Sequence, residues 1–362
     1  MNKAFKYRLY PTQEQQEMFA KTFGCVRFIY NKMLSDKIEY YKETKQKLNN
    51  TPAQYKKEFE WLNEVDSLAL ANAQMNLQSA YNNFFRNTKV GFPKFKSKKH
   101  KKNIYTTNNQ NGTISIIGNH IKLPKVGNVK IVYHRIIPDD YKIKSATISL
   151  TASGKYYVSV LTEYQINIPT IKLDKDNSLG LDYSSHSFYA DSQGKEANYP
   201  KFYRRTQQKL ANEQRKLSYM KYGSSNYLKQ KLRVAKISEH ISNQRKDWLH
   251  KLSTELSNNY DYICVEDLNM KNMSQSLKLG KSTMDNGFGM FKTFLQYKLM
   301  ERGKQFIVID KWFPSSKMCR FCGTVNKDLK LSDRVWTCSC GKTLNRDENA
   351  AINILDVGLS MV

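Results

Sequence analysis

The first hundred residues show two patterns of apolar and polar positions. Residues 4–9 alternate with a period of two, which predicts a β-strand. Pro11 and Thr12 follow, and Thr12 with Gln15 fits the capping box that begins a helix. Apolar residues then recur three and four apart, and the same spacing returns from about residue 66, so we expect helices after the strand. The two helical faces carry Phe19, Phe23, Val26, Tyr30 and Met33, and then Leu70, Ala73, Leu77, Tyr81 and Phe84.

Residues 104 to about 163 show the pattern of an all-β region. Short runs that favour strands, such as TISII, VKIVYH and YYVSVLTEY, are separated by Asn, Gly, Pro and Asp. A small barrel is the natural closure for so many short strands. We expect the strand near residue 4 to join this barrel, which makes the intervening helices an insertion.

From residue 178 strands alternate with helices, which is typical of a mixed α/β domain. A cysteine-rich insert precedes the last helix, and no internal repeat is visible. The sequence therefore predicts an α/β domain that follows a β domain. The expected elements of the α/β part are strands at 178–183, 262–265 and 305–309, a hairpin turn at 191–195, and helices at about 201–256, 288–302 and 347–355.

Positive charge is the strongest compositional signal. The 362 residues include 59 Lys plus Arg against 32 Asp plus Glu, a formal net charge of +27. Such a field attracts polyanions, so nucleic acid is the expected partner, ahead of an anionic membrane or a structural role of the ribosomal kind. No stretch reaches the roughly 20 apolar residues of a membrane span, and the N-terminus lacks an apolar signal core. We therefore expect a cytoplasmic protein with no membrane partner.

Two basic segments are candidate nucleic-acid contacts. Residues 91–102 interleave lysines with two aromatic residues, a combination that suits phosphate contact and base stacking. Residues 201–251 form a basic helical region with an apolar side, which favours a wall along phosphates. A solvated linker and a solvated helix pair are the plain alternatives. The candidate contact residues are Phe92, Lys94, Phe95, Lys96, Lys98, Lys99, Arg204, Arg205 and Arg245.

Four of the six cysteines form two short pairs. Cys319 and Cys322 have two residues between them, Cys338 and Cys340 have one, and a glycine follows each pair. Four thiolates from two such knuckles complete a tetrahedral shell around zinc, and four protein ligands leave no open position. The pattern therefore predicts a structural zinc site, with incidental cysteines or an iron–sulfur cluster as the alternatives.

Three carboxylates follow or begin elements of the α/β region. Asp182 lies in an apolar strand, Glu266 ends another strand, and Asp347 begins the last helix. Each alone is more often a cap or turn residue, but an RNase H-like sheet brings these three places to one edge. Converging carboxylates repel one another unless a cation binds, and two Mg²⁺ or Mn²⁺ ions there can support phosphodiester hydrolysis. The rival acids are Asp191, Asp267, Asp333 and Glu348, and His186 is either a proton carrier or a surface histidine.

Seven longer motifs are spread over nearly the whole chain. They are KAFKYRLYP at 3–11, GFPKFK at 91–96, GLD at 180–182, VEDL at 265–268, FPSSKMC at 313–319, WTCSCG at 336–341 and NRDENAA at 345–351. Together they resemble the TnpB family, the compact RNA-guided nucleases encoded by insertion sequences and related to type V CRISPR effectors. The chain departs from the usual family pattern in the YSSH run after Asp182 and in the shorter second knuckle.

The resemblance implies a RuvC-like nuclease domain with an inserted zinc ribbon, preceded by a β-barrel wedge domain that carries a helical recognition insertion. It assigns catalytic magnesium to Asp182, Glu266 and Asp347, and it makes Thr107, Asn108 and Asn109 candidate contacts to DNA. The implied bounds are 1–10 and 104–175 for the wedge, 11–103 for recognition, 176–312 and 342–362 for the nuclease, and 313–341 for the zinc ribbon.

The function that the resemblance implies is RNA-guided cleavage of double-stranded DNA next to a short target-adjacent motif, by magnesium-dependent hydrolysis. In such enzymes the protein reads the short motif and base pairing reads the rest. The expected partners are a guide RNA made from the transposon end and the target DNA, with one protein molecule per RNA. A nuclease-dead RNA-guided repressor, a transposase that acts without RNA, and a plain zinc-ribbon DNA-binding protein are the alternatives.

Overall fold

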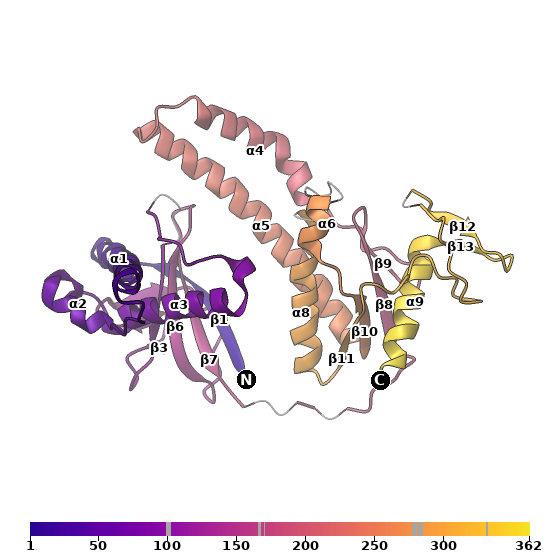
Figure 1. Ribbon diagram of the computed structural model, residues 1–362, viewed down its shortest axis with the longest axis horizontal. Helices are drawn as coiled ribbons and strands as arrows, with labels where there is room; N and C mark the ends of the chain where they lie inside the picture. Colours follow the sequence, from indigo (N-terminus) through magenta and orange to yellow (C-terminus); the bar gives the residue numbers. More distant parts are fainter. Residues whose placement is uncertain (99–102, 166–167, 170, 277–279, 281–284, 331) are drawn as a thin grey trace. The chain divides into compact units, whose positions relative to one another are not determined.

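The computed structural model describes residues 1–362 apart from 99–102, 166–167, 170, 277–279, 281–284 and 331. The chain divides into two compact units, Met1–Gln165 and Ile166–Val362, which are described in turn (Figure 1). Each unit contains its own sheet and its own hydrophobic core. The site residues can therefore be placed within their own unit.

A seven-stranded antiparallel sheet forms the centre of the first unit, in the order β2-β6-β7-β1-β5-β4-β3. The strand β1 (Asn2–Tyr10) pairs with β7 (Tyr156–Glu163) from Asn2 opposite Glu163 to Leu9 opposite Tyr156. The expected union of the first strand with the later all-β region is therefore confirmed. The other strands are β2 (Asn103–Asn108), β3 (Ser115–Ile117), β4 (His120–Leu123), β5 (Gly127–Ile131) and β6 (Lys142–Leu150).

The expected closure of these strands into a barrel is wrong for the part of the unit that the structure describes. The edge strands β2 and β3 do not pair with each other, and β3 has only three residues. Helical side chains instead complete the core on one face, because Phe19 and Phe23 lie against Tyr156 and Tyr105 at ring distances of 5.6 and 5.7 Å. A sheet that helices cover on one face buries that face without closing on itself.

The helices of the first unit begin where the capping residues predict. In α1 (Gln13–Thr44) the Thr12 side chain accepts a hydrogen bond from the Gln15 backbone N–H, and the Gln15 side-chain oxygen accepts one from the Thr12 backbone N–H. The helix α3 (Ser67–Arg86) is capped by Asp66. Their apolar faces join the sheet in one core. The remaining helical segments are α2 (Pro52–Glu58), η1 (Glu60–Asn63) and η2 (Thr88–Val90).

A mixed four-stranded sheet forms the centre of the second unit, in the order β11-β10-β8-β9. The strand β10 (Tyr262–Glu266) runs parallel to both β8 (Ser178–Ser184) and β11 (Gln305–Ile309). The strand β9 (Phe188–Asp191) returns antiparallel beside β8. Strands thus alternate with helices along the chain, as the sequence predicts.

Helices cover both faces of this sheet (Figure 1). On one face lie α5 (Ser225–Asn259) and α8 (Phe288–Glu301), and on the other lies α9 (Arg346–Ser360). The helix α4 (Phe202–Ser218) pairs with the first part of α5 as a long hairpin. None of the helices in the described ranges combines the length and apolarity that a membrane span requires. The shorter elements are α6 (Met270–Ser276), β12 (Val335–Thr337) and β13 (Thr343–Asn345).

Candidate active site and metal centre

Alternation along β8 directs Asp182 towards α9. Leu179 and Leu181 are fully buried in the cluster that includes α5 and α8. Gly180, between them, faces the opposite way, since a Cβ built on it would lie 2.1 Å from the Ala351 carbonyl oxygen of α9. Side chains two apart on a strand share a face, so Asp182 points to the same side as Gly180. Only glycine at position 180 lets α9 approach this strand so closely.

The strand β10 repeats this arrangement. Ile263 and Val265 join the cluster with α5 and α8, whereas Cys264 belongs to the cluster with α9. A Cβ on Gly358 of α9 would lie 2.4 Å from the Cys264 sulfur, so the helix is as close here as it is at β8. Glu266 follows two residues after Cys264 and therefore faces α9 as well.

The three predicted carboxylates meet at this edge of the sheet. Val265 pairs with Leu181 in parallel register, so the next residues, Glu266 and Asp182, lie side by side where β10 ends. Asp347 lies in the first turn of α9. Burial raises the pKa of Asp182 well above its usual range, and the nearby charges of Asp347 and Glu266 raise it further. Burial also raises the pKa of Glu266 to about 7. The edge therefore holds more negative charge than its surroundings neutralise.

Two arginines bind Asp347, and reasoning from sequence missed both. Arg334 Nη1 lies 2.7 Å from one carboxylate oxygen, and Arg346 Nη2 lies 3.0 Å from the other. The Asn345 side chain caps the helix by accepting from the Asp347 and Glu348 backbone N–H groups. Arg346 is visible in the NRDENAA motif, but the sequence gives no sign that Arg334, thirteen residues from Asp347, would reach the same carboxylate.

The rival acids have other partners. Asp191 accepts from the backbone of Gln193 and Lys195, as a turn residue does. Asp333 accepts from the Lys330 backbone within the cysteine-rich insert. The remaining two are each paired with one cation: Asp267 with Lys292 at 3.5 Å and Glu348 with Arg320 at 3.6 Å. These contacts explain each rival locally, whereas the pKa values of Asp182 and Glu266 stay raised although Arg346 and Lys292 partly offset their charges.

Four cysteine sulfurs lie together in the insert before α9. The ligand atoms of Cys319, Cys322, Cys338 and Cys340 are all within 4.8 Å of one another. The Cys322–Cys338 and Cys319–Cys340 sulfur distances are 3.5 and 3.8 Å. Zinc–sulfur bonds of about 2.3 Å at tetrahedral angles place sulfurs about 3.8 Å apart. The four cysteines could therefore hold zinc without rearrangement.

Two buried amides attach this cysteine cluster to α9. The Asn353 amide donates to the carbonyls of Ser315 and Met318, and the Asn349 amide donates to Met318. Asn349 also accepts from the Arg320 backbone N–H. Both asparagines are 1% exposed, and they lie within two turns after Asp347. The order of the cysteine insert is thus linked to the position of the carboxylate.

The basic segment at 91–98 packs on the helices of the first unit. The Lys96 backbone exchanges hydrogen bonds with the Asn31 side chain, and its amine lies 3.9 Å from the centre of the Tyr30 ring. Phe92 contacts Tyr81 edge-on. Of the other candidates here, Lys94, Phe95 and Lys98 are exposed, and Lys99 lies outside the described residues.

The remaining candidate contacts divide between interior and surface. Thr107 is buried and donates to the Asp66 carboxylate, and the Asn109 side chain bonds to Ile143 and Ile114 backbone groups. These bonds favour a structural role. Asn108 contacts Asn72 at 3.5 Å, and Arg245 pairs with buried Asp285 at 3.5 Å. By contrast, Arg204 and Arg205 are exposed and line a cavity of about 450 Å³ with His186, Tyr199 and Lys201.

Three family models match this chain. A model described as a helix-turn-helix domain (HTH_OrfB_IS605) matches residues 1–46. A model described as "Probable transposase" (OrfB_IS605) matches residues 159–277, and one described as a Cas12f1-like TNB domain matches residues 288–354. The last match contains the cysteine cluster and Asp347, and the second contains Asp182 and Glu266.

Relatives with similar sequences extend over almost the whole chain. A Streptomyces pristinaespiralis protein named "Putative RNA-guided DNA endonuclease" is 34% identical, over 99% of this chain and 90% of the relative. InsQ of Escherichia coli K12, named in the same way, is 30% identical over 98% and 92%. A Cas12f1 structure solved with sgRNA and target DNA shares the fold, with a TM-score of 0.59, 12% identity and 98% of each chain covered. The chain belongs to the TnpB family.

Proposed function

We propose that this protein is an RNA-guided DNA endonuclease of an insertion-sequence transposon. It cuts double-stranded DNA next to a short target-adjacent motif by magnesium-dependent phosphodiester hydrolysis. The observation that carries the proposal is that Asp182 and Glu266 lie side by side and face α9, whose first turn carries Asp347, close enough for its charge to raise the pKa of Asp182. Two relatives that align over nearly the whole chain bear the name of this activity.

The two units supply the parts that such an enzyme needs. The second sheet with its helices, 176–312 and 342–362, is a RuvC-like nuclease domain, and residues 313–341 are its zinc ribbon. In the first unit the seven-stranded sheet is a wedge and the helices between β1 and β2 form a recognition insertion. The alternation of parallel strands and helices, and the four-cysteine cluster before the last helix, support this assignment.

The donor set fits hard divalent cations. Burial raises the pKa values of Asp182 and Glu266, and nearby carboxylates raise that of Asp182 further, so a cation at this edge would keep both acids ionised. Magnesium bound by the three acids would supply activation of the attacking water and stabilisation of the leaving oxygen. Arg334 and Arg346 hold the Asp347 carboxylate in place, and Asn345 fixes the helix turn that carries it.

Guide RNA and target DNA fit the charge of the molecule. A net charge of +27 favours binding to phosphate backbones, and exposed Arg204 and Arg205 provide cations in the same unit as the acids. The guide is an RNA made from the transposon end, and pairing between guide and DNA selects the target. We expect one protein molecule with one RNA in the cytoplasm.

The deciding experiment combines the purified protein, its transposon-end RNA and a matched DNA duplex. We expect cleavage with magnesium, none with EDTA, and none by Asp182→Ala, which should still bind the RNA. Asp267→Ala is the matched control, since this exposed acid is one residue from Glu266 and pairs with Lys292. Cleavage by Asp182→Ala would refute the site, and RNA-dependent DNA binding without cleavage by the wild type would favour the repressor. Strand transfer without RNA would favour a transposase.

A further inference from the structure

The first part of the hairpin of α4 and α5 is strongly one-sided in charge. Residues 201–238 contain eleven Lys and Arg and one acid, Glu213. Glu213 is already occupied, because Lys216 donates to one oxygen at 2.8 Å and Gln230 to the other at 2.7 Å. The outer surface of the hairpin therefore presents cations with no free acid among its described residues.

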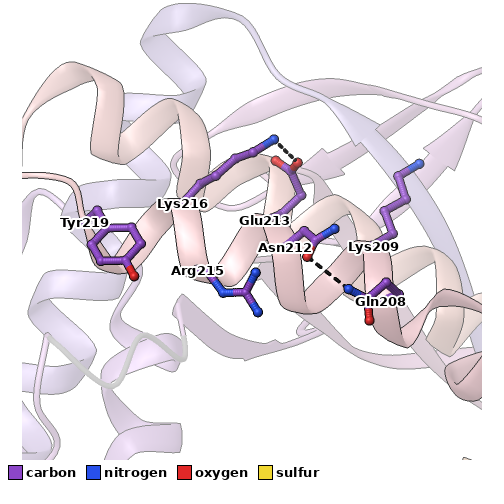
Figure 2. A pocket seen from close by; sticks show the side chains of 7 residues that line it. All are labelled: Gln208, Lys209, Asn212, Glu213, Arg215, Lys216 and Tyr219. Atoms are coloured by element: carbon purple, nitrogen blue, oxygen red, sulfur yellow. Dashed lines mark hydrogen bonds and ion pairs between the residues drawn. The ribbon is translucent and has the colours of Figure 1, made fainter.

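One face of α4 carries a row of polar and aromatic side chains beside some of these cations. Gln208, Asn212, Arg215 and Tyr219 follow one another at spacings of four, three and four, which places them along one side of the helix. They line a cavity of about 690 Å³ together with Lys209, Lys216 and Glu213, the acid that Lys216 and Gln230 already bind (Figure 2). At about 1.5 Å per residue the row is roughly 17 Å long. That length matches about five stacked nucleotides at about 3.4 Å each.

The row ends at an aromatic residue that the fold leaves exposed. Tyr219 is 83% exposed, and Tyr222 in the following turn is 76% exposed. Tyr219 lies at the cavity beside Arg215, and Figure 2 shows both side chains on the same side of the helix. Aromatic rings beside cations form the stacking platforms on which proteins bind unpaired bases, whereas the bases of a duplex are already stacked on one another.

We propose that this face of α4 binds an unpaired stretch of RNA, with a base stacked on Tyr219 and phosphates held by Lys209 and Arg215. RNA is the occupant because ribose 2′-hydroxyls can pair with the amide groups of this face. Gln208 Nε2 donates to Asn212 Oδ1 at 3.2 Å, which leaves the Gln208 oxygen to accept from a 2′-hydroxyl and the Asn212 amide nitrogen to donate to one. This inference rests on the proposed RNA-guided function, which requires a bound RNA. It goes beyond that function by placing an RNA contact on a helix that carries none of the three proposed catalytic carboxylates.

The test measures the contact directly. The full-length protein is incubated with a short unstructured oligouridine that contains 4-thiouridine, at raised salt, and cross-linked peptides are identified by mass spectrometry. We expect a cross-link at Tyr219. Affinity should fall by about 5- to 100-fold in Tyr219→Ala, since one stacked base contributes roughly 1–3 kcal/mol, and should stay near the wild-type value in Tyr219→Phe.

Tyr41→Ala is the matched control. Tyr41 is 57% exposed on α1 and has Lys45 beside its ring, yet it lines no cavity among those described. We expect it to bind oligouridine as the wild type does, and we expect a DNA oligomer of the same sequence and an RNA duplex to bind more weakly. Equal binding of DNA or of duplex would overturn the assignment to unpaired RNA. Wild-type affinity in Tyr219→Ala, no cross-link at Tyr219, or no binding of oligouridine by the wild type would overturn the α4 site alone. Failure of the wild type to bind its transposon-end RNA would instead overturn the proposed function.

Discussion

Asp182, a proposed catalytic acid, illustrates how a buried carboxylate costs stability. Its folded pKa is raised by burial and by two neighbouring carboxylates, so the native state resists ionisation of a group that the unfolded chain ionises freely. A raised carboxyl pKa removes stability as pH rises from the unfolded value, near 4, towards the folded value. The sheet edge is therefore strained electrostatically at neutral pH unless a cation is bound.

We predict that Asp182→Asn stabilises the protein in the absence of magnesium. The amide keeps the shape of the protonated acid and cannot ionise, so the gain in free energy of unfolding should grow from pH 4 to 7 and reach roughly 1–3 kcal/mol. Urea unfolding at several pH values would measure it. Asp191→Asn is the control with the opposite sign, because its carboxylate accepts two backbone N–H groups in a turn. A destabilised Asp182→Asn would show that the carboxylates do not repel one another.

The stability of the second unit also depends on the small size of Gly180. A methyl group there would lie 2.1 Å from the Ala351 carbonyl oxygen, so α9 must move away from β8. We predict that Gly180→Ala lowers the free energy of unfolding by about 1–3 kcal/mol, as overpacking does, and reduces cleavage because Asp347 moves with the helix. Gly24→Ala is the matched control, since nothing lies within 4 Å of its Cβ position inside α1. This control should gain about 0.5–1 kcal/mol. A stable, active Gly180→Ala would contradict the close approach.

At the scale of elements, a buried lysine joins α8 to α5. Lys298 is 7% exposed, and its amine donates to the His250 carbonyl and to the hydroxyls of Ser253 and Thr254. Burial lowers its pKa to about 8. Three acceptors match the three protons of an ammonium group, so this one side chain satisfies polar groups in both helices.

We predict that stability rises from about pH 8 to 10 in the wild type and that this rise is absent in Lys298→Met. The folded pKa lies below the unfolded value of 10.5, so the native state binds fewer protons in this window and its relative stability increases with pH. The difference between the two proteins should change by roughly 2–3 kcal/mol across the window. Equal pH profiles in urea unfolding would show that the amine is already solvated.

The elements also show what a sequence can and cannot predict here. The inclusion of β1 in the later β region, the capping box of α1 and the order of the three acids follow from local patterns and from the family motifs. The open edges of the first sheet do not, because strand alternation says which face is buried but not what covers it. The contacts of Arg334, Asn349 and Asn353 depend on where a loop comes to rest, and polar residues in loops have no periodicity that reveals their partners.

At the scale of the whole molecule, the hydrophobic cores belong to single units, whereas the positive charge is shared by both. The hydrophobic clusters are confined to one unit or the other, whereas basic residues lie on both. Binding of a polyanion would therefore neutralise repulsion across the whole chain without involving either core. The four-cysteine cluster belongs to the second unit alone, and its amide contacts to α9 stay within that unit.

We predict that the two units unfold in two transitions and that zinc removal lowers only one of them. Each unit has its own sheet and its own core, so each can unfold cooperatively. Removal of a bound zinc ion would leave four thiolates without the cation that holds them together. It would loosen the segment that Asn349 and Asn353 hold against α9. In calorimetry of the RNA-free protein, a strong zinc chelator or Cys338→Ser should lower the midpoint temperature of the second unit's transition. That transition is recognised because a separately expressed fragment of residues 1–165 lacks it. Cys25→Ser, at a buried position of α1, should lower the other midpoint instead. A single transition that shifts as a whole with either change would show that the units are not independent.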